Sequence, residues 1–279
     1  MNSTASPEVS YAVESTDGNR IAVYEYGNKS GIELVFLHGF ATDHHVWFQQ
    51  YKASALTDCC RIIVLDIRGH GQSFVEDCDY SNNDLWADDL YSVLGKTNIK
   101  KPVVVACSYG ARMINDYLLR YGSTAIAGIN YVAAASLNNP AFIGPDHQLL
   151  MSMCSEKENE CMQANQQFMH KIFGDIEQAD EYELIRKAIE IIPSNVKLQL
   201  RNRALIYDDL LASLSVPVMV THGENDSFVS PDLSRELAKT VLNGQVSIYE
   251  NAGHAPFVSQ AQRFNRELID FVKRAESMH

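Results

Sequence analysis

The chain lacks the long apolar segments that a membrane span or a secretion signal requires. No apolar run approaches the roughly 18–20 residues of a membrane span. The N-terminal sequence MNSTASPEVS has no basic stretch followed by an apolar one, as a signal peptide would have. There is also no internal repeat and no low-complexity tract. We therefore expect a cytoplasmic protein that does not act at a membrane.

Basic residues and closely spaced cysteines are also scarce. The chain has 23 lysines and arginines against 35 acidic residues, a net charge of −12. This balance argues against nucleic acid and anionic membranes as partners, because both attract clustered basic side chains. Six cysteines in 279 residues form no dense framework, and a chain of this length does not need disulfides to fold. We expect free thiols in a reducing compartment.

What the chain does contain is an alternation of apolar strands and helical segments. Helical patterns lie between most of the strands, for example at 45–56 and from Ser81 to Leu94. This alternation predicts an α/β fold with a mostly parallel eight-stranded sheet and helices on both faces. The eight predicted strands are 10–14, 20–26, 33–37, 61–65, 103–106, 125–133, 216–221 and 245–249.

Residues 137–214 interrupt this alternation. The stretch is mostly helical, rich in Met, Gln and Glu, and contains no convincing strand. We interpret it as an insertion before the last two strands that folds as a helical lid over one end of the sheet. The predicted core domain then comprises residues 1–136 and 215–279.

The most informative motif is a serine between a buried strand and a helix. Ser108 directly follows the apolar strand, and the residues two before and two after it, Ala106 and Gly110, are small. Small residues at these positions let strand and helix approach closely, so the turn presents the serine hydroxyl at the edge of the sheet. A serine before a helix is often only a cap, but this local pattern favours a nucleophile.

Polar residues also follow three other predicted strands. The sequence HGF at 38–40 follows the third strand, Asp226 follows the seventh, and His254 follows the last after a glycine. The carboxyl ends of parallel strands lie at one edge of a sheet, where functional groups gather. A serine hydroxyl needs a base to take its proton, and a carboxylate can orient a histidine for that task.

With these segments the chain resembles the α/β-hydrolase family, within its esterase, cofactor-free haloperoxidase and C–C hydrolase group. The matching segments are HGF at 38–40, DxRGHGxS at 66–73, the serine turn at 106–110, GxxD at 223–226 and GH at 253–254. One departure is Ala106, where the family usually has glycine. A serine nucleophile argues against haloalkane dehalogenase or epoxide hydrolase chemistry, which needs a carboxylate there.

The resemblance implies a role for each site residue. Ser108 would be the nucleophile, Asp226 the acid and His254 the base, and the backbone N–H groups of Phe40 and Tyr109 would form the oxyanion hole. We expect neither a cofactor nor a metal. The spacing within the family favours Asp226 over its neighbour Glu224 as the acid.

Three other histidines compete with His254 for the role of base. We expect His38 to order its own turn through backbone hydrogen bonds and His222 to be structural. We expect His70 to lie in a loop whose Asp66 and Arg68 form an ion pair. Only His254 follows the last strand after a glycine.

Several further groups invite a functional interpretation. The pair His44-His45 suggests a metal site, but adjacent helical residues do not face each other, so packed or solvated histidines are favoured. Cys154 and Cys161 are predicted to share one helix face as core packing. The lid methionines 151, 153, 162 and 169 either line an apolar pocket or simply pack.

The sequence predicts a serine hydrolase that cleaves a small ester through an acyl-enzyme intermediate. C–C bond hydrolysis and cofactor-free perhydrolysis use the same triad and stay open, as does a ligand-sensing receptor that retains it. We expect a small-molecule partner, and a homodimer stays open. Cationic side chains in the pocket would favour a charged dioic substrate; the candidates are Arg112, Lys171, Arg201 and Arg203.

Overall fold

A single eight-stranded sheet forms the centre of the computed structural model, which describes residues 7–74, 78–134, 136 and 139–278. Its strand order is β1-β2-β4-β3-β5-β6-β7-β8. The β1–β2 and β2–β4 pairs are antiparallel and all the others are parallel, which confirms the predicted fold class. The strands are β1 (Val9–Glu14), β2 (Arg20–Gly27), β3 (Ile32–Leu37), β4 (Cys60–Leu65), β5 (Val103–Cys107), β6 (Gly128–Val132), β7 (Val218–Gly223) and β8 (Gly244–Tyr249).

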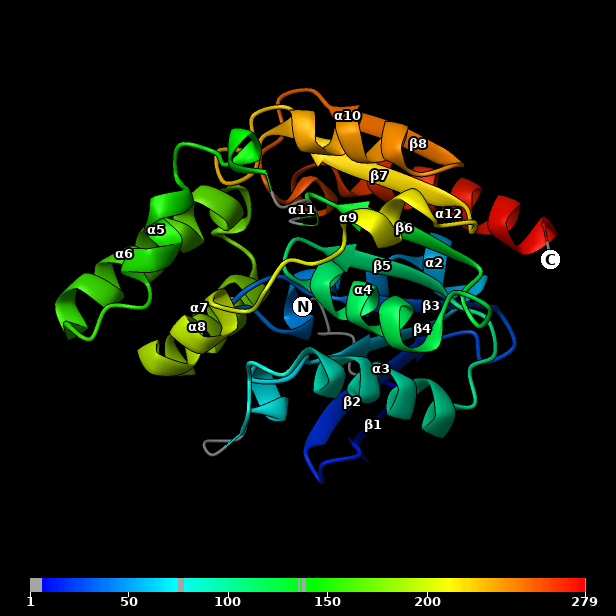
Figure 1. The fold of residues 1–279 in the computed structure, drawn as a ribbon, viewed down its shortest axis with the longest axis horizontal. Coiled ribbons are helices and arrows are strands. Elements are labelled where there is room, and N and C mark those ends of the chain that lie inside the picture. Colours follow the sequence, from blue (N-terminus) through cyan, green and yellow to red (C-terminus); the bar gives the residue numbers. More distant parts are fainter. Residues whose placement is uncertain (1–6, 75–77, 135, 137–138, 279) are drawn as a thin grey trace.

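The central strands are continuous apolar runs because helices cover the sheet on both faces. Every residue of β5, β6 and β7 is buried, whereas the edge strand β8 is mostly half-buried or exposed. The helices α3 (Asn83–Thr97), α4 (Gly110–Tyr121) and α10 (Pro231–Thr240) lie in front of the sheet in Figure 1, and α12 (Ala261–Ser277) runs behind it. The main hydrophobic core therefore has two layers, one on each side of the sheet.

A group of helices lies between β6 and β7 in the sequence. All but the last of them lie beyond the carboxyl ends of the strands in space (Figure 1), whereas the last packs against α4 and α10. The group comprises α5 (His147–Ser152), α6 (Glu158–Phe173), α7 (Asp180–Ile191), α8 (Ser194–Arg201) and α9 (Asp208–Ala212), with short 3-10 turns η3 (Pro140–Phe142) and η4 (Gly174–Ile176). This confirms the helical insertion. The exact division into core and lid stays a prediction, and its boundary at residues 137 and 138 lies outside the described residues.

Some predicted boundaries differ from the structure. The predicted helix 45–56 is broken into η1 (His44–Trp47), α1 (Phe48–Tyr51) and α2 (Ser54–Thr57). A tertiary contact accompanies the break: buried Gln50 donates to Phe257 O at 2.9 Å and to Asn265 Oδ1 at 3.0 Å. The cap of α3 is Asn82 and not Ser81, because the Asn82 side chain accepts from Asp84 N.

The sixth strand begins three residues later than predicted. Ile126 N donates to Ser123 O at 3.0 Å, so the first residues of the predicted 125–133 strand form a turn and β6 begins at Gly128. The remaining short elements are η2 (Gly71–Ser73) and α11 (Pro256–Ser259). Within the described residues, no helix combines the length and apolar character needed to cross a membrane.

Two buried histidines join the loops that follow β3 and β4. His38 accepts a hydrogen bond from Ile67 N at 2.9 Å through Nε2 and contacts Gly39 O at 2.9 Å through Nδ1. His70 accepts from Ala41 N at 3.0 Å through Nε2, while its Nδ1 contacts Arg68 O at 2.9 Å. Each ring thus donates from one nitrogen and accepts at the other, the pattern of a neutral imidazole. The expected backbone role of His38 agrees with these bonds.

The expected ion pair between Asp66 and Arg68 is wrong. The Arg68 guanidinium instead contacts Asp89 at 2.6 Å and Asp17 at 2.6 Å, and its side chain is fully buried. Asp66 contacts the His44 ring at 2.8 Å and accepts from the backbone of Gln72 at 2.9 Å. Asp66 and Arg68 both come directly after β4, but their side chains bind different partners. Their spacing in the sequence does not predict these partners.

Neutral buried histidines predict how stability changes with pH. Burial lowers the pKa of His70 to about 3, from an ordinary value of 6.5, and also lowers the pKa of His38. Below pH 6.5 the unfolded chain binds protons that the folded chain does not, so stability falls as the pH falls towards the folded pKa. At pH 5, His70 alone accounts for a loss of about 2 kcal/mol relative to pH 7.5.

The substitution His70→Gln removes this titration but keeps one hydrogen-bond acceptor. Urea unfolding of both proteins at pH 7.5 and pH 5 measures the two stability differences. We expect the variant to be less stable at pH 7.5 but to lose less stability on acidification than the wild type. Equal losses in the two proteins would show that His70 is protonated in the folded state.

Candidate active site

Ser108 lies in a strained turn between β5 and α4. Its φ angle is 48°, a left-handed conformation that is uncommon for residues other than glycine. Its N–H donates to Val132 O at 2.8 Å, which holds the turn against β6. A Cβ at Gly110 would lie 2.6 Å from His38 O and 2.7 Å from Leu37 O. Only glycine therefore lets α4 start this close to the end of β3.

The acid and base candidates are in direct contact. His254 Nδ1 lies 2.6 Å from Asp226 Oδ2, and both residues are buried. The other carboxylate oxygen, Oδ1, accepts from Phe228 N at 2.8 Å and from Val229 N at 3.1 Å. Burial alone would raise the pKa of Asp226, but the charge of His254 and hydrogen bonds from both neighbouring imidazoles outweigh it and lower the pKa. Asp226 is therefore ionised at neutral pH.

His222 contacts the same carboxylate, a role that the sequence analysis did not predict. Its Nε2 lies 2.9 Å from Asp226 Oδ2, and its Nδ1 lies 2.6 Å from the Ser234 hydroxyl on α10. His222 and Asp226 are four residues apart in the sequence. This spacing alone does not predict the contact, because the contact depends on the conformation of the turn after β7. The rival acid Glu224 is exposed to solvent.

Ser108 and His254 line the same cavity, together with Phe40 and Tyr109. No hydrogen bond joins the serine hydroxyl to the imidazole among the described residues; such contacts are often loose without substrate. The turn that carries Phe40 adjoins the serine, since a Cβ on Gly39 would lie 3.6 Å from Ser108 Cβ. The structure thus brings all five predicted site residues to the carboxyl edge of the sheet.

The backbone N–H groups of Phe40 and Tyr109 have no acceptor within the parts of the chain that are described. Both residues are themselves buried, at 6% and 4% exposure. Buried N–H groups without a partner are rare in proteins. Two of them beside Ser108 can stabilise an oxyanion there.

The cavity has a volume of about 350 Å³, a size typical of small-molecule sites. Its wall is mainly apolar, and Arg112, Arg201 and Arg203 also line it. Lys171, the fourth cationic candidate, does not line this cavity and instead lies 2.8 Å from Asp146. The apolar wall includes Phe142, Ile143, Leu150, Phe168, Ile172, Phe173, Leu205 and Phe228.

The lid methionines do not line this cavity. Met153 and Met169 are buried in the core, whereas Met151 and Met162 are exposed. The prediction for Cys154 and Cys161 is wrong in its geometry: Cys161 lies in α6, but Cys154 lies in the turn after α5, because two helices form where one was expected. All six cysteines are free.

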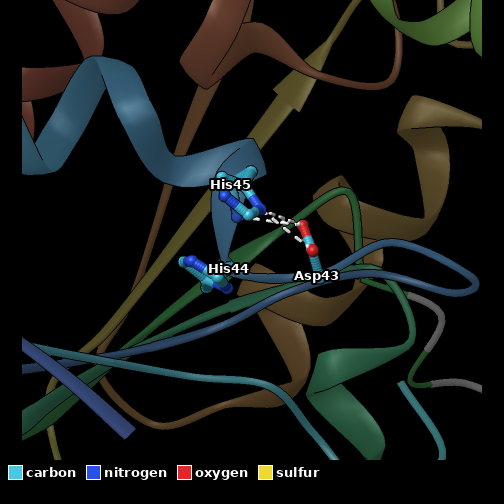
Figure 2. A group of neighbouring side chains, drawn as sticks. All are labelled: Asp43, His44 and His45. Carbon is cyan, nitrogen blue, oxygen red and sulfur yellow. Dashed lines mark hydrogen bonds and ion pairs between the residues drawn. The ribbon is translucent and has the colours of Figure 1, made fainter. Parts of the chain in front are cut away.

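The histidine pair after β3, His44 and His45, is not part of the wall of this cavity. Figure 2 shows the pair with Asp43. Potential ligand atoms of Asp43, His44 and His45 lie within 4.8 Å of one another. The two rings are tilted by 35° with centroids 3.9 Å apart, contrary to the expectation that they do not face each other, because they lie in a 3-10 turn. His45 Nδ1 binds Asp43 at 2.9 Å and His44 Nδ1 binds Asp66, so protein partners already satisfy these atoms.

Comparison with known proteins agrees with this architecture. A model described as "Alpha/beta hydrolase family" matches residues 34–267. The chain is 24% identical to the bifunctional esterase/perhydrolase DCH of Acinetobacter calcoaceticus, over 94% of this chain and 99% of the relative. It is 26% identical to a non-heme chloroperoxidase of Kitasatospora aureofaciens, over 92% and 98% of the two chains.

A solved structure extends this similarity to the whole backbone. A putative aryl esterase from Burkholderia cenocepacia superposes with a TM-score of 0.90 at 28% identity, over 96% of this chain and all of that chain (100%). The match covers both the sheet and the helical insertion. The chain therefore belongs to the alpha/beta hydrolase family.

Proposed function

We propose that this protein is a serine hydrolase that cleaves a small carboxylic ester through an acyl-enzyme intermediate. One observation carries the proposal: His254, which contacts Asp226 at 2.6 Å, lines the same cavity as Ser108 in its strained turn. The esterase names of the relatives support the same reaction class. The cavity volume of about 350 Å³ supports a small-molecule substrate.

The proposed reaction has two halves. In the first, Ser108 Oγ attacks the ester carbonyl while His254 Nε2 takes the hydroxyl proton, and His254 then returns that proton to the departing alcohol. In the second, water attacks the acyl-enzyme and gives its proton to His254. The acid product then leaves and Ser108 recovers its proton.

The surrounding groups would stabilise the charges that form in these steps. Ionised Asp226 stabilises the imidazolium of His254 and holds its tautomer. The N–H groups of Phe40 and Tyr109 donate to the oxyanion, and losing one such donor typically costs about 2.7–4 kcal/mol of transition-state stabilisation. Buried Asp226 and the two N–H groups are in place before any substrate binds, so little reorganisation is needed.

The same residues could also transfer the acyl group to hydrogen peroxide or support C–C cleavage, and a receptor could retain them without fast turnover. A panel that compares ester hydrolysis, peracid formation and dienol cleavage distinguishes these reactions. We propose ester hydrolysis as the main activity because the enzymes similar over the full chain include an esterase/perhydrolase and a putative aryl esterase.

The first test removes the nucleophile. Ser108→Ala should lower kcat on p-nitrophenyl acetate by about three orders of magnitude or more, because the acyl-enzyme can no longer form. It should also abolish covalent labelling by a fluorophosphonate. Ser54→Ala, which changes an exposed serine in α2, serves as the matched control and should retain full activity. Equal turnover by the wild type and Ser108→Ala would refute the assignment.

The second test separates the two acids that follow β7. Asp226→Asn keeps the shape of the side chain but removes its charge, so we expect kcat to fall by about three to four orders of magnitude. Glu224→Gln makes the same change at an exposed position and should leave kcat within about twofold. Steady-state kinetics of both variants, with a check of folding by circular dichroism, decides between them. Similar rates in both variants would exclude Asp226 as the acid.

A further inference from the structure

Three arginines line the cavity, and no acidic side chain lines it among the described residues. Arg112 comes from α4, Arg201 ends α8, and Arg203 lies in the loop that follows. Asp116, one turn further along α4 than Arg112, is the acid in contact with this group. The balance of charge among these side chains therefore depends on which arginine Asp116 neutralises.

Asp116 neutralises Arg203. The two form an ion pair in which both side chains are almost fully buried, at 0% and 1% exposure. Arg203 also donates to Asn83 Oδ1 at 3.1 Å and lies over the Trp86 ring at 4.0 Å. The Tyr207 hydroxyl donates to the remaining oxygen of Asp116 at 2.8 Å. Each oxygen of Asp116 therefore already has a partner, and among the described residues neither oxygen contacts a second arginine.

Arg112 has no carboxylate partner among the side chains that the structure describes. It is 7% exposed, and its Nη1 donates to Arg203 O at 3.1 Å. Its Nε is buried and has no hydrogen-bond partner in the described part of the chain, and its guanidinium lies 4.9 Å from the centre of the Tyr109 ring. A charged group this deeply buried is usually paired. Arg112 therefore has unused donors at the wall of the cavity.

Arg201 has the same deficiency. Its Nη2 lies 3.0 Å from His147 Nε2, and its buried Nε has no partner among the residues that the structure describes. His147 can accept this hydrogen bond only as a neutral ring. Burial and the nearby charges of Arg201 and Arg112 lower the pKa of His147, so it stays neutral. Arg112 and Arg201 line the same cavity, and burial together with the charge of Arg112 lowers the pKa of Arg201.

Arg112 and Arg201 are two positive charges without a carboxylate partner in the described structure, and both line an apolar cavity. This arrangement favours the binding of an anion from outside the chain. An unpaired buried charge is strongly destabilising, whereas a carboxylate can accept from two guanidinium groups at once. Arginine suits this task because its planar donors match the geometry of a carboxylate. The remaining wall of the cavity is apolar and accommodates a hydrocarbon chain or ring.

We infer that the substrate is an ester carrying a second, free carboxylate, which Arg112 and Arg201 bind while Ser108 attacks the ester carbonyl. This inference rests on the proposed function, and it adds the chemical class of the substrate. The carboxylate belongs either to the acyl chain, as in the half-ester of a dicarboxylic acid, or to the leaving group. In both cases the arginines bind the carboxylate at one end of the substrate, and the apolar wall contacts the part of the substrate between the carboxylate and the ester.

The test compares esters matched in size but not in charge. p-Nitrophenyl hydrogen adipate carries a carboxylate on the acyl side, and p-nitrophenyl heptanoate is its neutral counterpart. Acetoxybenzoate and its methyl ester form the corresponding pair for the leaving-group side. For one of the two pairs we expect the wild type to favour the charged ester by tenfold or more in kcat/KM, and that pair identifies the side that carries the carboxylate.

The arginine variants then test the origin of this preference. Arg201→Gln and Arg112→Gln should each reduce the charged-to-neutral ratio of kcat/KM by about 10- to 100-fold, mainly through a higher KM, because each removes a charge-assisted hydrogen bond. Arg201→Lys keeps the charge and should retain part of the preference. Lys171→Gln is the matched control, since Lys171 lies in the lid but does not line the cavity, and it should leave the ratio unchanged.

A binding measurement tests the carboxylate site without depending on catalysis. Calorimetric titration of adipate and of benzoate into the Ser108→Ala protein should show binding of at least one of them that weakens with added salt. That binding should weaken tenfold or more when Arg201→Gln is combined with Ser108→Ala. Because Arg201 is only partly buried, this variant is expected to fold even if Arg112→Gln does not.

The outcomes separate the two proposals. If both neutral and charged esters are cleaved at equal kcat/KM and the arginine variants leave the ratio unchanged, the carboxylate inference is wrong while the role of Ser108 stands. If no ester is cleaved and Ser108 is not labelled, the proposed function fails. In that case, binding of neither anion to the Ser108→Ala protein would overturn the carboxylate site as well.

Discussion

The close approach of α4 to the end of β3 is the constraint on which the site depends. Gly110 permits this approach, since a side chain there would collide with the carbonyl oxygens of Leu37 and His38. The approach forces Ser108 into a left-handed turn, a conformation that costs about 1–3 kcal/mol and persists only where the surrounding structure holds it. The same turn places the N–H of Tyr109 beside the serine and begins the helix that carries Arg112 and Asp116.

Charge is distributed unevenly across the cavity. On one side, two histidines and two backbone N–H groups contact the ionised Asp226. Its negative charge can therefore stabilise His254 when His254 takes up a proton. On the other side Arg203 is neutralised by Asp116, while Arg112 and Arg201 keep their charge without a carboxylate partner in the described structure. An ester with a free carboxylate fits both sides: the reacting group lies at the histidine and the anion at the arginines.

The lid also shapes the acid end of the site. Ile143 and Val229 form an antiparallel bridge, and Ser230 N donates to Phe142 O at 2.9 Å, so the segment that enters the lid is attached to the loop after Asp226. At the other end of the lid, the Tyr109 hydroxyl donates to Leu200 O at 2.8 Å. Movement of the lid would therefore act on the neighbours of both the acid and the oxyanion donor, which links substrate entry to the geometry of the site.

Sequence alone determined the alternation of strands and helices, the helical insertion and the family, because these depend on local periodicity and on short motifs such as the serine turn. It also identified Ser108, Asp226 and His254, because each of them follows a predicted strand. Tertiary structure alone decided which side chains meet. His222 contacts the carboxylate of Asp226, Arg68 pairs with Asp17 and Asp89, and two of the four cationic candidates line the cavity without a carboxylate partner in the described residues. The physical reason is that charge pairing and burial depend on distances between segments far apart in the chain, which no local pattern records.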